Sequence, residues 1–427
     1  MKLHFMGIAG SGASGVASIC EQEGWKVSGC DPDKNSPYLT FLKKKKIEIF
    51  SQHSPNHLSK VDKLIISPSV LSKNPKHPEI ASAKKLKIPI LTWQQFLGRF
   101  LIKNKFVIAI AGTHGKSTTT AMIAFILEKA LFDPTVILGA IFPHWGTNFR
   151  LGKSKYFVIE ADEYANNFLN YNADIVVITN IDYDHPEYFK TEKDFKNSFE
   201  KFVLATKKNS TLILGPDLKI WNKNGKTYEY KRIPNLNLLI PGQFNKINAA
   251  LAMVVAEILG IKESRLIISK FTGLSRRFEF KGEVKNIKVF DDYAHHPTEI
   301  AATLTAARDK FPKNKIWCVF QPHMYTRTKV LFNKFVKVFE NSKIDEIILV
   351  DIFAARQRNF SKISSFDLAI SVKNKKVKYI GELKQAAKYL IKNLRGGDIL
   401  MVLGAGDIYL LSNLVLEGLK KWQNSNS

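Results

Sequence analysis

The stretch Phe106-Val-Ile-Ala-Ile-Ala-Gly-Thr-His-Gly-Lys-Ser-Thr-Thr-Thr120 decides the fold of the central part of this chain. An apolar, β-branched run stops at a glycine-rich turn, and a helical pattern follows from Thr118 to Ala130. This order predicts a buried strand, a phosphate-binding loop and the N-terminus of a helix. A glycine-rich turn that merely starts a helix is the alternative, but it leaves Lys116 and Ser117 unexplained.

The loop carries the chemistry that a nucleoside triphosphate needs. Its backbone amides are expected to point at the phosphates, while Lys116 neutralises their charge and the Ser117 hydroxyl binds Mg²⁺. We therefore expect ATP or GTP here. The common motif has glycine at the position of Ile110, so this loop is a shortened variant. The predicted nucleotide contacts are Gly112, Thr113, His114, Gly115, Lys116, Ser117 and Thr118.

Length and composition limit the class of protein. A chain of 427 residues predicts about two to four domains, and 45% hydrophobic with 24% charged residues is typical of a soluble globular protein. No apolar run is long enough to span a membrane, and glycines interrupt the apolar N-terminus, which argues against a signal peptide. The cysteines Cys20, Cys30 and Cys318 show no disulfide or metal spacing. We expect a cytoplasmic protein with reduced thiols.

The formal net charge of +26 allows two interpretations. One is binding to nucleic acid. The other is a lysine-rich surface around a site for anionic substrates. The excess lysines are spread along the chain, and no stretch interleaves basic residues with stacking aromatic residues. These features favour the second interpretation, so we expect no nucleic-acid partner.

Residues 1–102 form the first predicted domain. A strand over 3–7 leads into Gly10-Ser-Gly-Ala-Ser-Gly15, a helix reaching Gly24, and a second strand from Lys26 that is followed by Asp31. This G-x-G-x-x-G pattern between a strand and a helix is typical of a dinucleotide or nucleotide-diphosphate site. A tight glycine turn without a ligand remains the alternative.

Residues 103–273 form the second predicted domain. Two further apolar strands end in acidic clusters, which contain Glu160 and, on the second strand, His185. Ligands of open α/β sheets bind where parallel strands end. A carboxylate and a neutral imidazole beside bound phosphates are suitable Mg²⁺ ligands, so we expect a metal site formed by Ser117, Glu160 and His185.

Residues 274–427 form the third predicted domain, again with alternating strands and helices. Its strand ends carry histidine and arginine, which suits an anionic or carboxylate ligand. Arg356 follows one of these strand ends and is a second candidate for a carboxylate. The dipeptide His295-His296 lacks the spacing of a metal motif. We expect residues 423–427 to be disordered.

The sequence resembles the Mur ligase family, the ATP-dependent amide-forming enzymes of peptidoglycan precursor synthesis. Gly112-Thr-His-Gly-Lys-Ser117 is similar to the G-T-x-G-K-[ST] loop of that family, which accounts for Ile110. Asp291-Asp-Tyr-Ala-His-His-Pro-Thr-Glu299 and Phe320-Gln-Pro-His-Met-Tyr-Thr-Arg-Thr328 are most like the branch that joins L-alanine to UDP-N-acetylmuramate. The resemblance covers essentially the whole chain.

The resemblance implies three α/β domains: a Rossmann-like UDP-sugar domain, a central ATP and Mg²⁺ domain with the phosphate loop, and a Rossmann-like amino-acid domain. It implies that ATP converts the muramoyl carboxylate into an acyl phosphate, which the alanine amine then attacks. It assigns catalytic roles to Lys116, Glu160 and His185, and it adds the nucleotide contacts Asn245, Asn248, Arg277 and Asp292. The implied substrate contacts are Gly10, Ser11, Gly12, Ser14, Tyr293, His295, His323 and Arg327.

Three rival functions stay open at this point. One is the ligase that joins a preformed tripeptide to the same UDP-sugar. A second is an NAD-dependent oxidoreductase built on the first domain, which leaves the phosphate loop unexplained. A third is an ATPase acting on nucleic acid. The sequence gives no oligomeric state.

Overall fold

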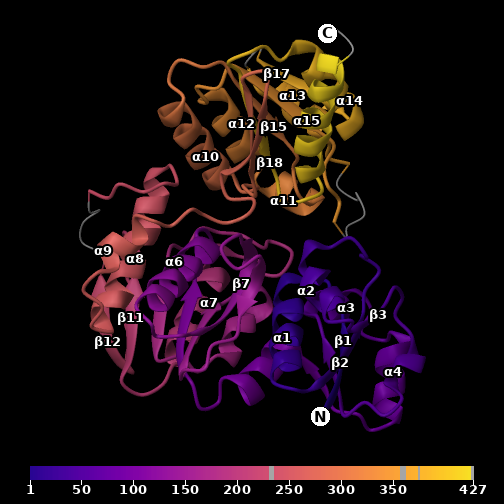
Figure 1. Ribbon diagram of the computed structural model, residues 1–427, viewed down its shortest axis with the longest axis vertical. Helices are drawn as coiled ribbons and strands as arrows, with labels where there is room; N and C mark the ends of the chain where they lie inside the picture. The colour runs from indigo at the N-terminus through magenta and orange to yellow at the C-terminus, as the bar shows by residue number, and fades with distance from the viewer. Residues whose placement is uncertain (230–234, 356–361, 374–375, 425–427) are drawn as a thin grey trace. The chain divides into compact units, whose positions relative to one another are not determined.

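The computed structural model of the protein describes residues 1–229, 235–355, 362–373 and 376–424. Its described residues form three β-sheets (Figure 1). The chain divides into two compact units, which are described separately. The first unit comprises Met1–Asp182, Lys196–Pro234 and Asn248–Lys270, and the second comprises Tyr183–Phe195, Asn235–Ile247 and Phe271–Ser427.

The first sheet is entirely parallel and lies in the first unit, with strand order β3-β2-β1-β4-β5. Its strands are β1 (Lys2–Met6), β2 (Lys26–Cys30), β3 (Glu48–Phe50), β4 (Lys63–Ile66) and β5 (Ile90–Thr92). The connecting helices are α1 (Ser11–Gln22), α2 (Thr40–Lys44), η2 (Pro55–Leu58), α3 (Pro68–Lys73), α4 (Pro78–Lys85) and α5 (Trp93–Phe96). The predicted strand–glycine loop–helix–strand order at the N-terminus is therefore confirmed.

The glycines of the first loop serve the packing of α1. A Cβ atom on Gly12 would lie 2.3 Å from the Trp93 ring, which is too close for any side chain. Gly15 lies against Ile137, where a Cβ atom would be 3.4 Å from the nearest methyl group. Gly7 has a φ of +86°, a conformation that glycine adopts readily. Close packing explains these positions in addition to any approach of a ligand.

The second sheet completes the first unit, with strand order β12-β11-β10-β6-β9-β7-β8. The strands are β6 (Phe106–Ala111), β7 (Thr135–Phe142), β8 (Thr147–Arg150), β9 (Tyr156–Glu160), β10 (Ile175–Ile178), β11 (Ser210–Leu214) and β12 (Gly225–Glu229). All neighbours are parallel except β7 and β8. The helices are α6 (Lys116–Lys129), α7 (Glu192–Leu204), α8 (Gln243–Ile258) and α9 (Ser264–Ile268).

The third sheet lies in the second unit, with strand order β13-β14-β18-β15-β16-β17. The strands are β13 (Glu279–Val284), β14 (Ile287–Asp292), β15 (Ile316–Phe320), β16 (Glu346–Val350), β17 (Val377–Gly381) and β18 (Ile399–Leu403), and only β13 is antiparallel to its neighbour. The helices are α10 (Pro297–Lys310), α11 (Tyr325–Val330), α12 (Phe332–Glu340), α13 (Ser365–Ser371), α14 (Leu383–Asn393) and α15 (Tyr409–Asn424).

Both faces of the third sheet are covered by helices. One apolar core joins it to α10, α12 and α13, and a second joins it to α14 and α15 (Figure 1). This two-sided burial explains why its central strands read as continuous apolar runs. The C-terminal prediction was partly wrong, because α15 continues to Asn424, while residues 425–427 lie outside the described part of the chain. Among the described helices, none has the length and apolar character needed to cross a membrane.

Candidate functional site

The phosphate loop joins β6 to α6, as the sequence predicted. Gly112 and Gly115 have φ values of +130° and +81°, which disfavour any other residue. A Cβ atom would lie 2.1 Å from Thr179 Oγ1 at Gly112, and 2.6 Å from Asn248 Oδ1 at Gly115. Both glycines are therefore required by backbone conformation and by close packing.

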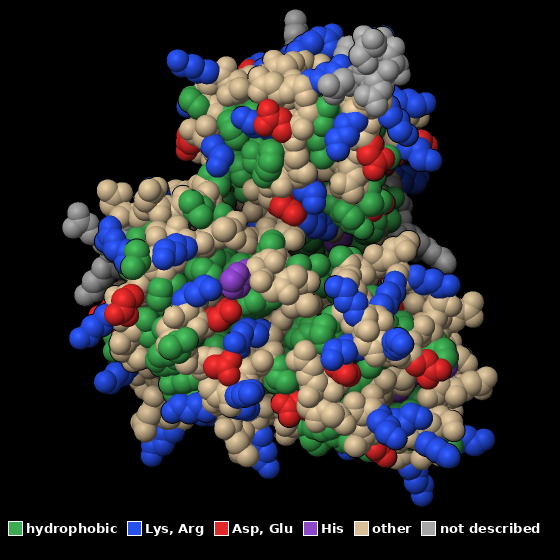
Figure 2. All heavy atoms as spheres, in the orientation of Figure 1, with side chains coloured by type: hydrophobic (Ala, Val, Ile, Leu, Met, Phe, Trp, Pro, Cys, Tyr) green, Lys and Arg blue, Asp and Glu red, His purple; other side chains and the backbone are tan. Residues whose placement is uncertain are grey.

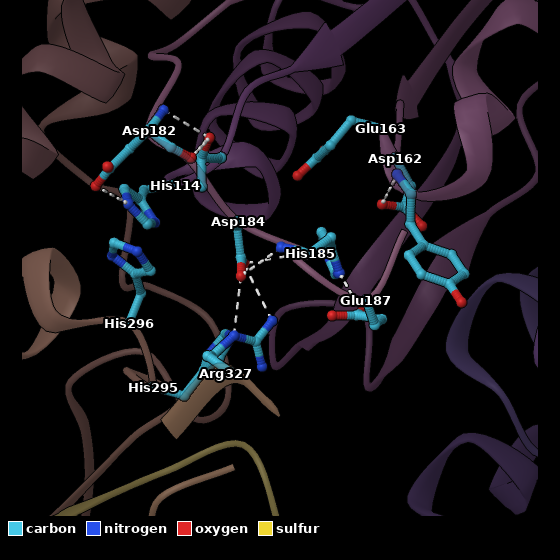
Figure 3. A network of polar contacts seen from close by, with 12 residues as sticks. His114, Asp162, Glu163, Asp182, Asp184, His185, Glu187, His295, His296 and Arg327 are labelled. Atoms are coloured by element: carbon cyan, nitrogen blue, oxygen red, sulfur yellow. Dashed lines mark hydrogen bonds and ion pairs between the residues drawn. The ribbon is translucent and has the colours of Figure 1, made fainter. Parts of the chain in front are cut away.

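The end of β10 holds this loop in place. The His114 amide donates to Asn180 Oδ1 at 2.9 Å, and the Thr113 amide donates to the Asn180 carbonyl at 3.1 Å. The Thr113 hydroxyl donates to the Asp182 carbonyl at 2.8 Å, and His114 Nε2 lies 3.1 Å from Asp182 Oδ2 (Figure 3). Asn180 thus positions the loop, and the sequence analysis did not single it out although it directly follows a predicted strand.

Lys116 is the first residue of α6, and its side chain is 13% exposed. Its Nζ donates to the carbonyls of Gly112 and Thr113 and pairs with Glu163 at 2.9 Å. Burial lowers the pKa of this lysine, but Glu163 and its acidic neighbours outweigh that effect and raise the pKa above its usual value. Lys116 is charged, and the carboxylate of Glu163 neutralises it.

The candidate metal ligands differ in their placement. Ser117 is buried in the first turn of α6. Glu160 ends β9, which pairs with β6, and its Oε2 accepts a hydrogen bond from the Gly139 amide at 2.7 Å. His185 belongs to the second unit, where its Nδ1 lies 3.1 Å from Glu187 Oε1 (Figure 3).

The second unit contains a buried polar cluster centred on Arg327. Its Nε donates to Asp184 Oδ1 at 2.9 Å and its Nη2 donates to Asp184 Oδ2 at 3.1 Å (Figure 3). Its Nη1 lies 3.1 Å from His323 Nδ1. The side chains of Arg327 and Asp184 are 2% and 7% exposed. Burial raises the pKa of Asp184, but Arg327 outweighs that effect and holds the pKa well below its usual value.

The two histidines of this cluster are neutral. Burial lowers the pKa of His295 to about 4 and the pKa of His323 to about 2, with the charge of Arg327 adding to the effect. Their rings lie 5.9 Å apart, and His295 Nδ1 lies 3.0 Å from the Tyr293 carbonyl. Among Tyr293, His295, His323 and Arg327, Arg327 carries the positive charge, and Asp184 neutralises it. The assignment of these four residues to an anionic or carboxylate ligand stays a prediction.

Asp292 and Arg277 flank the same strand end of the second unit. Asp292 accepts hydrogen bonds from the amides of Ala294 at 2.7 Å and Phe278 at 2.8 Å. Burial raises its pKa to about 6. The Arg277 guanidinium lies over the Tyr293 ring, 5.0 Å from its centroid. Asp292 therefore fixes the backbone that carries Arg277 and Tyr293.

The remaining predicted residues are placed as follows. Asn245 and Asn248 both lie on α8, but Asn245 belongs to the second unit and Asn248 to the first. The Ser14 hydroxyl donates to the Ser11 carbonyl at 2.9 Å, and so it is engaged within α1. Gly10 is the N-cap of α1. Arg356 lies outside the described residues.

Comparison with known proteins now places this fold. Family models match three successive parts of the chain: "Mur ligase family, catalytic domain" over residues 2–105, "Mur ligase middle domain" over 110–233, and "Mur ligase, glutamate ligase domain" over 276–406. The chain belongs to the Mur ligase family. The predicted α/β class with three domains is thereby confirmed.

Several curated relatives of this Mur ligase carry the same name. This chain is 37% identical to the UDP-N-acetylmuramate–L-alanine ligase of Acetivibrio thermocellus, with 97% of this chain and 95% of the relative covered. It is 36% identical to the ligase of the same name from Clostridium perfringens, with 97% and 98% covered.

Solved structures agree with this assignment. The UDP-N-acetylmuramate-alanine ligase of Thermotoga maritima is 27% identical, with both chains fully covered (100% each) and a TM-score of 0.83. A murein peptide ligase from Psychrobacter arcticus has a TM-score of 0.74 with 98% of each chain covered, but at 21% identity it shows the fold alone.

Proposed function

We propose that this Mur ligase joins L-alanine to UDP-N-acetylmuramate with ATP, in the synthesis of peptidoglycan precursors. One observation carries the proposal. Relatives that align with 97% of the chain at 36–37% identity are named UDP-N-acetylmuramate–L-alanine ligases. The phosphate loop supports it independently, because a carboxylate must be activated before it forms an amide, and ATP bound at this loop would supply the activating phosphoryl group.

The reaction balances in two steps. A carboxylate oxygen of the muramoyl group attacks the γ-phosphorus of ATP, and ADP leaves. The deprotonated amine of alanine then attacks the acyl carbon, and phosphate leaves with the oxygen that it received. The first step needs positioning and charge neutralisation more than covalent help, and Lys116 with the amides of Gly112–Gly115 supplies these at the β- and γ-phosphates. Lys116 must exchange Glu163 for phosphate when ATP binds.

The Mg²⁺ that such a ligase needs fits the residues present. The Ser117 hydroxyl and the Glu160 carboxylate are hard oxygen ligands on neighbouring elements at the phosphate loop. The metal would neutralise the charge that develops on the phosphoryl oxygens. His185, which the resemblance also assigns to Mg²⁺, stays a prediction.

The first loop is our candidate for the UDP diphosphate, through Gly10, Ser11, Gly12 and Ser14. The loop leads into α1, whose N-cap is Gly10. Because glycine has no side chain, no N-cap side chain binds the first amides of this helix. The first amides of a helix attract an anion through their hydrogen bonds and the helix dipole. Because Trp93 leaves no room for a side chain at position 12, this position could contact a diphosphate only through its backbone.

The second unit is our candidate for the amino acid, through Tyr293, His295, His323 and Arg327. Neutral histidines donate or accept hydrogen bonds without repelling an ammonium group. Arg327 supplies positive charge, while its Nε and Nη2 are already held by Asp184. Nη1 faces His323 Nδ1 at 3.1 Å, so a substrate carboxylate would approach the fork on this side, beside His323.

The test is release of ADP by the full chain with UDP-N-acetylmuramate and each amino acid or peptide in turn. We expect the highest kcat/KM with L-alanine and a product one alanine heavier. Turnover with the tripeptide and not with alanine would instead assign the recycling reaction. ATP hydrolysis stimulated by nucleic acid would instead support an ATPase that acts on nucleic acid. Against that function, the Lys and Arg side chains are scattered over the visible face of each unit and form no single patch there (Figure 2).

A further inference from the structure

Four side chains of the first unit converge on one face of the first sheet. His4 lies in β1, Cys30 ends β2, His57 lies in η2, and Glu79 lies in the first turn of α4. One ligand atom of each lies within 4.8 Å of the corresponding atom of the others. Because the chain positions are far apart, the sequence analysis found no metal spacing, and the strand order β2-β1-β4 is what brings them together.

From this geometry we propose that His4, Cys30, His57 and Glu79 form a Zn²⁺ site that is separate from the ATP and Mg²⁺ site. Two neutral imidazoles, a thiolate and a carboxylate are ligands that Zn²⁺ accepts in tetrahedral sites. Their combined charge of about −2 would balance the charge of the ion. The proposal does not depend on the ligase reaction.

The distances fit a tetrahedron around one ion. A tetrahedral edge is about 1.6 times the bond length, so bonds of about 2.0–2.3 Å give edges of about 3.3–3.8 Å. His4 Nε2 lies 3.1 Å from Glu79 Oε1 and 3.3 Å from Cys30 Sγ. Glu79 Oε1 lies 3.7 Å from Cys30 Sγ and 3.6 Å from His57 Nδ1. These four edges need shifts of only a few tenths of an ångström, and the other two, which join His57 to His4 and to Cys30, are no longer than 4.8 Å.

Burial and an unmet hydrogen bond also support a metal ion at this cluster. The side chains of His4 and Glu79 are 0% exposed and that of His57 is 10% exposed. His57 Nδ1 is buried and has no hydrogen-bond partner among the described residues. A divalent cation would bind Cys30 and the Glu79 carboxylate together, whose Sγ and Oε1 atoms lie 3.7 Å apart.

The residues around the cluster orient its ligands. His4 Nδ1 lies 2.9 Å from Ser28 Oγ, which leaves Nε2 facing the cluster. His53 Nδ1 lies 2.9 Å from Cys30 Sγ, and so it can donate a hydrogen bond to a thiolate. Metal sites in proteins have such outer partners for their histidine and cysteine ligands. Cys30 also precedes Asp31, whose Oδ2 accepts from the Ala9 amide at 3.0 Å, so a metal would anchor the base of the first glycine loop.

The test uses the full chain after treatment with a chelator and titration with Zn²⁺ and Co²⁺ in excess Mg²⁺. We expect one tight Zn²⁺ per chain. Bound Co²⁺ should give the visible bands of a tetrahedral complex and a near-ultraviolet thiolate-to-cobalt charge-transfer band. The phosphate-loop site contains no thiol, so binding there gives no such band.

Cys30→Ser should abolish the charge-transfer band, and His57→Gln should weaken Zn²⁺ binding about 10-fold or more. Cys20→Ser is the matched control, because Cys20 is a buried cysteine of α1 in the same unit and should leave both signals unchanged. Should Cys30→Ser fail to fold, His57→Gln decides, since His57 lies at the rim of the cluster. The absence of a band in the wild type, or unchanged Zn²⁺ affinity in His57→Gln, would overturn the proposal.

Discussion

Arg327 and Asp184 form a two-point ion pair although 143 positions separate them in the chain. Both charges are almost fully buried within the second unit, and each satisfies the other. The segment Tyr183–Phe195, which follows a strand of the second sheet, therefore belongs with the unit that contains the third sheet. This pair fixes the orientation of Arg327, the positively charged residue among the four of the candidate amino-acid site.

Replacing Arg327 by lysine should raise the alanine KM well above any change in the ATP KM. Lysine keeps the charge but cannot reproduce the planar fork that holds both Asp184 oxygens and reaches His323. Steady-state kinetics with each substrate varied in turn checks this. Asp184→Asn is the companion variant, and it should also raise the alanine KM because it releases the guanidinium. A change confined to the ATP KM would place Arg327 in the nucleotide site.

Lys116→Ala should lower turnover on the order of 10³-fold or more, because it removes a charge that stabilises the transferring phosphoryl group. It should also destabilise the fold by about 1–3 kcal/mol, since Glu163 is 1% exposed and loses its ion partner. The measurement is ADP release by the folded fraction, with unfolding in urea as the control. Retention of more than about a tenth of wild-type turnover would contradict the phosphoryl-transfer role.

Glu160→Gln should raise the Mg²⁺ concentration needed for half-maximal rate and lower kcat. The glutamine oxygen can still accept from the Gly139 amide, so the contact between β9 and β7 is retained. His185→Ala should act in the same direction if it also binds Mg²⁺. Affinity for the UDP-sugar, measured by calorimetry, should not change in either variant. Lost UDP-sugar affinity at normal Mg²⁺ dependence would remove the residue from the metal site.

Asp291→Asn should stabilise the protein at pH 8 by about 1–3 kcal/mol. Asp291 is buried beside Ser412, and burial raises its pKa to about 7, above its value of about 3.9 in the unfolded chain. The protonated Asp291 carboxyl therefore makes its full contribution to stability below about pH 4, and this contribution is lost as the pH rises through about 7. Unfolding in urea at pH 8 and pH 5 measures this, and the gain should be smaller at pH 5. An equal gain at both pH values would show that the ionised carboxylate is not the cause.

The sequence could predict features that rest on neighbouring residues. The apolar run before Gly112 fixes β6, and Lys116 with Ser117 marks the start of α6. The strand order within each sheet could not be derived in this way. Consequently the sequence analysis did not foresee that the fold places Glu163 against Lys116. The boundaries 102/103 and 273/274 stay a proposal.

Side chains that meet only through the fold were also missed. Asp184 directly precedes His185 in one of the acidic clusters, but nothing local indicated that Arg327 would be its partner. Cys30 was judged by its spacing from other cysteines, while its neighbours in the structure are His4 and Glu79. Buried polar groups need partners wherever the chain brings them, so the pairing depends on topology and not on local pattern.

The packing of helix α1 restricts which segments can be exchanged between related Mur ligases. It covers β7 and β8 of the second sheet, the Ser11 carbonyl accepts from Asn148 Nδ2 at 2.7 Å, and the Tyr38 hydroxyl donates to the Gly139 carbonyl at 2.9 Å. Recombination at residue 102 would therefore pair two halves of one interface from different parents. Viable chimeras should inherit residues 1 to about 150 as a block, and natural crossovers in this family should avoid that interval.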